Sequence, residues 1–211
     1  MKQIKSIEDW NNLLNKADKS EDDFLQIGQA YEYGIICKNN FEIKTNLEKA
    51  FEWYLKGSEN NYCKIRVADL LSEGLGCEKN IQKSIELYTE LISKNMSIAA
   101  FNLSTVYRDL GNYDETYKLL YKVFEIDNVY PIELAFHYLY GIGTLVNKSK
   151  AKELFLNVTN NKKSYSDYEV EQANYQLALF YIANNEIDHA KKLLLENDNE
   201  FSYDLLNIIG R

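Results

Sequence analysis

The chain has 211 residues, and its hydrophobic content of 45% is high enough to form a packed core, which argues against a disordered chain. A formal charge of −8 disfavours nucleic acid as a partner, because nucleic-acid binding needs a basic surface, and it permits a basic protein partner. With one proline and nine glycines to interrupt the periodic segments, the composition predicts an all-helical protein.

The N-terminus, MKQIKSIEDWNN, has no apolar core of the kind found in signal peptides. No stretch approaches the ~18 apolar residues of a membrane-spanning helix. We therefore expect a cytoplasmic protein without a membrane partner. Ser6 is a suitable N-cap, and the spacing of Ile7, Trp10 and Leu14 predicts an N-terminal capping helix over residues 6–18.

Five segments along the chain share one pattern. Each starts with an aliphatic residue, continues with a small residue and places a large residue one helical turn after the first. This order suits a helix that packs closely against a neighbouring helix. The segments are IGQAYEYG (27–34), VADLLSEG (67–74), LSTVYRDL (103–110), LAFHYLYG (134–141) and LALFYIAN (177–184).

A second periodic segment follows each of these, with a small or short residue near its start: Ala50, Ser84, Thr116, Ala151 and Ala190. These residues are 34, 32, 35 and 39 positions apart, which is the period of helix–turn–helix solenoids. We expect the extra length of the first and last repeats to form loops, at ICKNNFEIKT (36–45) and NNKKSYSDYE (160–169).

The connections of the second and fourth repeats contain glycine pairs, Gly74 with Gly76 and Gly141 with Gly143. The first glycine of each pair suits the left-handed conformation of a helix C-cap, and the second lets the loop turn back without a clash at Cβ. Asn80 and Asn147 follow at the positions where the next helices need an N-cap. A dinucleotide fingerprint would need a preceding strand, so we interpret the glycines as loop structure.

The stretches EGLGCEKNIQKSIELYTE (73–90) and YGIGTLVNKSKAKELF (140–155) resemble the Sel-one-like repeat family, whose pattern runs Tyr-x-x-Gly-x-Gly-Val…Asp…Lys-Ala…Trp-Tyr. LEKAFEWYLKG (47–57) is similar to the second half of that pattern. The third and fifth repeats have the shorter loop of the related tetratricopeptide repeat. The usual aspartate or valine is replaced at Asn46, Asn80, Asn147, Cys77 and Thr144.

The resemblance implies an all-α, right-handed α-solenoid of about five helix–turn–helix repeats. We expect residues 1–211 to form one solenoid domain, with repeats over about 21–197. A C-terminal capping helix over about 200–210, in FSYDLLNIIG, would cover the apolar face of the last repeat, as the helix over 6–18 covers the first.

In solenoids of this type the first helix of each repeat lines the concave wall, and the resemblance implies the same here. Counting from the repeat register, we predict that a partner binds to Glu32, Tyr33, Asp69, Glu73, Arg108, Asp109, Phe136 and Tyr140. The acidic part of this set would steer a basic surface, and the aromatic part would supply desolvated anchors. The alternative is that the carboxylates are simply solvated and that Phe136 is buried between repeats.

Few residues offer chemistry. His137 lies within a packed helix and His189 near the start of another, and neither has an activating neighbour in the sequence. A pairing of Cys63 with His137 stays open. The three cysteines lack Cys-x-x-Cys spacing, which disfavours disulfides and zinc, and the chain has no phosphate-binding motif. We therefore expect no enzymatic activity, no metal and no cofactor.

Three hypotheses for the function follow. A small, acidic, repeat-only protein resembles immunity proteins, and the first hypothesis is that the chain neutralises a cognate basic toxin by occluding its surface. The second is a non-inhibitory adaptor or assembly scaffold, a role that Sel-one-like proteins in general have. The third is an enzyme with an unrecognised site.

Overall fold

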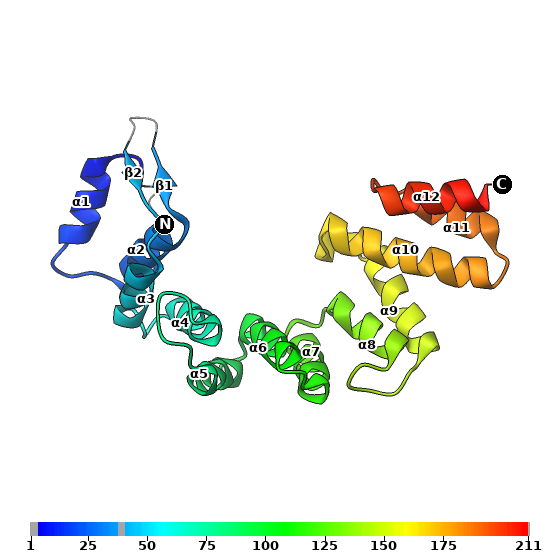
Figure 1. Cartoon of the computed structure of the whole chain (residues 1–211), viewed down its shortest axis with the longest axis horizontal. Helices are drawn as coiled ribbons and strands as arrows, with labels where there is room; N and C mark the ends of the chain where they lie inside the picture. Colours follow the sequence, from blue (N-terminus) through cyan, green and yellow to red (C-terminus); the bar gives the residue numbers. More distant parts are fainter. Residues whose placement is uncertain (1–3, 38–40, 211) are drawn as a thin grey trace. The chain divides into compact units, whose positions relative to one another are not determined.

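The computed structural model describes residues 4–37 and 41–210 (Figure 1). Within these ranges the chain is built from α-helices, with one short 3₁₀ helix and one two-stranded antiparallel hairpin. The elements are α1 (Ile7–Asn15), α2 (Glu21–Tyr33), β1 (Ile35–Ile36), β2 (Glu42–Ile43), α3 (Leu47–Lys56), α4 (Asn61–Glu73), α5 (Ile81–Ser93), α6 (Ser97–Asp109), α7 (Tyr113–Asp127), α8 (Ile132–Tyr140), α9 (Lys148–Asn160), η1 (Lys162–Ser164), α10 (Asp167–Ala183), α11 (Ile187–Leu194) and α12 (Glu200–Ile209).

The repeats are helix pairs. The first helices of the pairs are α2, α4, α6, α8 and α10, and the second helices are α3, α5, α7, α9 and α11. The all-α architecture of repeated helical hairpins is therefore confirmed. α1 packs on α2 before the first pair, and α12 packs on α11 after the last. The chain divides into two compact units, an N-terminal unit, Met1–Leu103, and a C-terminal unit, Ser104–Arg211. The prediction that residues 1–211 form a single domain stays a prediction.

The small residues of the repeat pattern lie where the helices meet. Ala50, Ala68, Ala135, Ala151, Ala178 and Ala190 are all fully buried. Gly28 gives the clearest reason for a small side chain, because a Cβ at this position would overlap the ring of Tyr54 on α3. The close approach of first and second helices that the sequence pattern predicts is therefore present in the core.

The predicted helix caps are confirmed. Gly74 (φ 76°, ψ 34°) and Gly141 (φ 70°, ψ 36°) end α4 and α8 in the left-handed conformation. The side chain of Asn80 accepts a hydrogen bond from the backbone N–H of Lys83. Asn147 caps α9 in the same way. These asparagines keep the capping function of the aspartate that is usual in the family pattern.

The second glycine of each pair lets its loop lie directly on a neighbouring helix. Gly76 and Gly143 both have positive φ, at 69° and 62°. A Cβ at Gly76 would overlap the backbone carbonyl of Leu47 at the start of α3. A Cβ at Gly143 would overlap the backbone carbonyl of Tyr113 at the start of α7. Each of these loops therefore fixes one repeat against the second helix of the repeat before it.

Three predicted boundaries differ from the structure. The N-terminal helix ends at Asn15 rather than at residue 18, and the Lys19 ammonium donates to the backbone carbonyl of Leu14 at this end. The loop predicted at 160–169 is shorter, because a capping box between Ser166 and Glu169 starts α10 at Asp167. The segment predicted as a loop at 36–45 contains part of a short hairpin, since Ile36 belongs to β1 and Glu42–Ile43 forms β2, and residues 38–40 lie outside the described residues.

Candidate partner-binding surface

An ion-paired cluster lies on the first helices of the N-terminal unit, where α2 packs against α4. Arg66 of α4 is placed between Glu32 of α2 and Asp69 of α4. Its Nε donates to Glu32 Oε2 at 3.2 Å, its Nη2 donates to Glu32 Oε1, and its Nη1 donates to Asp69 Oδ2. The side chains of Glu32, Asp69 and Arg66 are 7%, 13% and 29% exposed. We call these three residues the Arg66 cluster, and its formal charge is −1.

Buried tyrosines from the second helices complete the cluster. The Tyr54 hydroxyl of α3 donates to Glu32 Oε2 at 2.5 Å, and the Tyr88 hydroxyl of α5 donates to Asp69 Oδ1. The Asn102 side-chain amide donates to the same Asp69 oxygen at 2.9 Å. Burial, together with the neighbouring carboxylates, raises the pKa of both tyrosines well above the usual range, so both hydroxyls stay protonated donors.

The electrostatics of the cluster keep Arg66 charged. Burial opposes the charge of the guanidinium, but the hydrogen bonds to Glu32 and the charge of Asp69 outweigh it and hold the pKa of Arg66 above its usual range. The planar guanidinium is therefore fixed by two carboxylates, which are in turn fixed by two hydroxyl groups. The result is a rigid polar platform with one excess negative charge.

Exposed residues surround this platform. Tyr33, the last residue of α2, is 65% exposed, and the charges of Arg66 and Glu32 act on its hydroxyl. Glu73 lies one helical turn after Asp69 on α4 and is exposed. The structure thus brings the predicted residues Glu32, Tyr33 and Asp69 together, with Glu73 on the same face of its helix.

The predicted residues of the C-terminal unit form two groups. Arg108 and Asp109 lie at the end of α6 and pair with each other at 3.1 Å, with side chains that are 57% and 71% exposed. Phe136 and Tyr140 lie on α8, with ring centroids 6.4 Å apart. Phe136 also meets Phe155 of α9 edge-on, at 5.1 Å between centroids. We call Phe136, Tyr140 and Phe155 the aromatic cluster.

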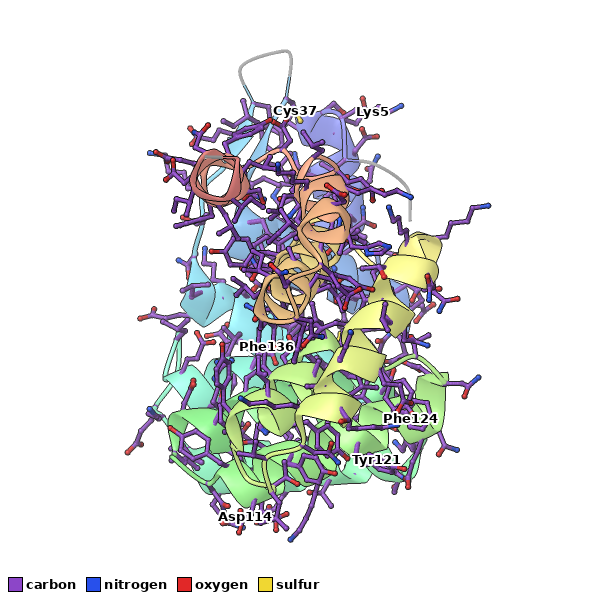
Figure 2. The ribbon with its side chains drawn as sticks, turned by 90° about the vertical axis from the view of Figure 1, so that its right-hand side faces the viewer. Lys5, Cys37, Asp114, Tyr121, Phe124 and Phe136 are labelled. Atoms are coloured by element: carbon purple, nitrogen blue, oxygen red, sulfur yellow. The ribbon has the colours of Figure 1, made fainter. Side chains whose placement is uncertain are left out.

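The aromatic cluster combines burial with exposure. Phe155 is fully buried, Phe136 is half-buried and Tyr140 is 60% exposed. Figure 2 shows Phe136 apart from a second aromatic group on α7, where the rings of Tyr121 and Phe124 are 5.7 Å apart. The alternative was that Phe136 is buried between repeats. Its ring instead packs on Phe155 of the same repeat and is partly exposed.

The two clusters use the same positions of the repeat. Asp69 and Phe136 both lie two residues after the aliphatic residue that opens the pattern of the first helix. Tyr88 and Phe155 both lie four residues after the small residue of the second helix. In the second repeat this pair of positions makes a hydrogen bond, and in the fourth repeat it makes a ring contact. The same two backbone positions thus carry polar side chains in the second repeat and apolar side chains in the fourth.

The structure differs from the sequence-based description of the carboxylates. Glu32 and Asp69 are ion-paired and mostly buried, whereas the sequence register treats them as exposed groups that steer a partner. Arg66, which compensates them, is absent from the predicted set. One signal was available, because Tyr54 and Tyr88 occupy equivalent positions, and a buried tyrosine hydroxyl needs a hydrogen-bond partner.

Cys63 and His137, the residues considered for catalysis, are both buried in the helical core. Burial, and then the nearby carboxylates of Glu21 and Asp22, raise the pKa of the Cys63 thiol to about 12, which opposes formation of a thiolate. His137 is buried, and its Nδ1 lies 2.5 Å from the backbone carbonyl oxygen of Ile142 in the glycine loop. Within residues 4–37 and 41–210, no cluster of His, Cys, Asp and Glu is arranged to hold a metal ion. In the same ranges, no helix combines the length and apolar character needed to cross a bilayer.

Comparison with known proteins now adds to this geometry. The family model described as Sel1 repeat matches residues 25–62, 63–96 and 132–156. The chain carries Sel1 repeats. The three matches fall on the helix pairs α2–α3, α4–α5 and α8–α9, which are the pairs with the Arg66 cluster and the aromatic cluster. Sel1 repeats support a function in protein–protein interaction.

Two solved structures show the same fold. The crystal structure of a Sel1 repeat protein from Oxalobacter formigenes is 20% identical, with a TM-score of 0.69, over 94% of this chain and 82% of that one. The second is c5321, a protective antigen present in uropathogenic Escherichia coli strains that displays an SLR fold. It is 18% identical, with a TM-score of 0.64, over 90% of this chain and 40% of that one. The comparison with curated proteins found no match.

Proposed function

We propose that this Sel1 repeat chain is a non-enzymatic interaction module whose first helices hold a basic protein, and that it acts as an immunity protein that neutralises a cognate toxin by covering its surface. The Sel1 repeats support the general class of function. The basic partner, the toxin and a cytoplasmic location are the specific parts of the proposal.

The distribution of charge carries the proposal. In the described part of the chain, the five first helices contain eleven carboxylates and three cationic side chains, a formal charge of −8. The five second helices contain ten of each, a formal charge of zero. The acidic excess of the first helices comes from α2 at −4, α10 at −3 and α8 at −1, whereas α4 and α6 have no net charge. Such an excess favours encounter with a basic surface.

Part of this excess has a structural role. Six of the eleven carboxylates lie in the first turns of α2, α8 and α10, where negative charge stabilises a helix N-terminus. The remaining carboxylates include those of Glu32, Asp69, Glu73 and Asp109, which belong to the predicted binding set. Arg66 compensates one charge in its cluster and Arg108 pairs with Asp109, so we assign electrostatic steering mainly to Glu73, which is exposed.

The Arg66 cluster in the N-terminal unit and the aromatic cluster in the C-terminal unit would each offer a docking site. A fixed guanidinium–carboxylate platform loses little conformational entropy when a partner docks on it. The exposed ring of Tyr33 beside the platform and the exposed ring of Tyr140 in the aromatic cluster are the residue type that is enriched among binding hot spots. We propose these two tyrosines as the main anchors.

The experiment is affinity capture from the native host with the tagged chain, followed by calorimetry and a growth assay with the captured protein. We expect one basic protein, bound with nanomolar affinity, whose expression stops growth unless the chain is co-expressed. The double variant Tyr33→Ala/Glu73→Lys should lose at least tenfold in affinity. Glu48→Lys, an exposed charge reversal on the second helix α3, is the matched control and should bind normally.

The outcomes separate the candidate roles. Tight binding without rescue of growth would support the adaptor hypothesis and refute the immunity role. Binding that is equally weakened by the control variant would show that general charge, and not the first-helix face, holds the partner. If no basic protein is captured, the proposal fails.

A further inference from the structure

A groove in the C-terminal unit has chemistry opposite to that of the acidic first helices. It has a volume of about 250 Å³ and is formed by α9, α10 and α11, which lie together in the yellow-to-orange part of the ribbon in Figure 1. The residues that matter for its chemistry are Leu156, Leu177, Tyr181, His189, Lys192 and Leu193. The groove therefore runs between the second helices α9 and α11 and one face of the first helix α10, and none of these lining residues belongs to the proposed toxin-binding set.

The groove has an apolar floor and an aromatic wall. Leu177 is fully buried, and Leu156 and Leu193 are half-buried beside it. The rings of Tyr181 and His189 stack with centroids 5.3 Å apart. The ammonium group of Lys152 lies 4.6 Å from the centroid of the Tyr181 ring. An apolar side chain can thus be buried on the floor while a cation stands at the wall.

The lining of the groove has a formal charge of +1, from Lys162, Lys192 and Glu196, with His189 taken as neutral. α9 and α11 together have a formal charge of +3, and the three carboxylates of α10 all lie near the start of that helix. Lys150 pairs with Glu153, and Lys162 at the rim pairs with Glu196 at 2.6 Å. His189 contacts Glu186 at 3.4 Å.

Two lysines outside these ion pairs determine which charge the groove favours in an occupant. Lys192 lies in its lining, and Lys152 stands on the Tyr181 ring at its wall. Neither takes part in the ion pairs around the groove, so their charges favour a negatively charged occupant.

We propose that this groove binds an acidic segment of a second protein, which places one apolar side chain over Leu156 and Leu193 and carboxylates beside Lys152 and Lys192. The volume supports a side chain rather than a whole small molecule, because ligand pockets usually measure about 300–1,000 Å³. The acidic charge of the chain as a whole disfavours nucleic acid. The chain would thus have two docking surfaces of opposite charge preference.

The test uses a fluorescein-labelled synthetic peptide of alternating glutamate and leucine and measures fluorescence anisotropy with the full chain. We expect micromolar binding that weakens as salt is added. Lys192→Glu should weaken binding about tenfold, because it both removes a cation and adds a repelling charge. Lys118→Glu, an exposed charge reversal on α7 outside the groove, is the matched control and should change binding less than twofold.

Two further peptides separate anchoring from simple charge attraction. A peptide of alternating glutamate and alanine should bind at least fivefold more weakly, because it lacks the apolar anchor. A peptide of alternating lysine and leucine should not bind at the groove, and Lys192→Glu should not weaken any binding that it shows. Equal binding of the leucine and alanine peptides, or equal effects of Lys192→Glu and Lys118→Glu, would overturn the proposal. Equally tight binding of a single-stranded DNA of the same charge would also overturn it. None of these results bears on the toxin-binding face, which uses other residues.

Discussion

Replacing Arg66 with methionine tests whether the polar platform is a structural unit. The variant keeps most of the apolar stem and removes the guanidinium from between Glu32 and Asp69. The two carboxylates, 7% and 13% exposed, then lose their shared cation while they remain withdrawn from solvent. Breaking a fully buried ion pair costs roughly 3–5 kcal/mol. Because the Arg66 side chain is 29% exposed, and because Tyr54 and Tyr88 still donate to the carboxylates, we expect a loss of about 2–3 kcal/mol.

Urea denaturation followed by circular dichroism measures this loss, with Arg108→Met as the matched control. Both variants remove one arginine from a first helix and change the net charge equally. Arg108 pairs with Asp109 where both side chains are largely exposed, and such pairs contribute less than about 1 kcal/mol. The reasoning would be refuted if the two variants lost the same free energy of unfolding. It would also be refuted if Arg66→Met were as stable as the parent chain.

Two further predictions concern stability. Gly143→Ala should destabilise the chain by about 2 kcal/mol more than Gly111→Ala. Both glycines have positive φ, but only at Gly143 would a Cβ overlap a backbone, that of Tyr113. Equal melting temperatures for the two variants would contradict this prediction. Burial lowers the pKa of His137 below its usual value, and the hydrogen bond to the Ile142 carbonyl opposes this shift. As pH falls below about 6.5, His137 is therefore protonated more readily in the unfolded chain than in the folded chain. The stability that His137 contributes is therefore complete above that pH and is lost as pH falls through the folded pKa. The melting temperature of His137→Gln should fall less than that of the parent chain between pH 7.5 and 5.5, and parallel falls would contradict the prediction.

The repeat framework could be predicted because it depends on local rules. A small residue such as Ala68 or Ala151 marks the close contact of a helix pair, and a glycine followed by an asparagine marks the end of one helix and the start of the next. These signals act within a few residues, so periodicity alone places them. The same rules explain why Gly76 and Gly143 occupy equivalent loops, although the sequence did not show which backbone each glycine approaches.

The surface chemistry could not be predicted to the same depth. Glu32 and Arg66 are 34 positions apart, and only the packing of α2 on α4 shows that the second compensates the first. The register assigned Glu32, Tyr33 and Asp69 to one binding face, which stays a prediction, and register alone gives no distance and no exposed fraction. The same limit applies to the groove at Lys192, which is made by side chains of three helices and leaves no motif in the sequence.

The contrast between Asp69 with Tyr88 and Phe136 with Phe155 shows how one framework can present different faces. Tyrosine and phenylalanine fill nearly the same space in the core, so exchanging them at the second-helix position leaves the packing of the pair intact. The hydroxyl of Tyr88, however, needs a polar partner and finds it in Asp69, whereas the ring of Phe155 is satisfied by the ring of Phe136. Two positions in a repeat can thus set whether its exposed face is polar or apolar without a change in the backbone. Docking on the Arg66 cluster requires a basic surface and docking on the aromatic cluster requires an apolar one, so each cluster selects its partner by more than net charge.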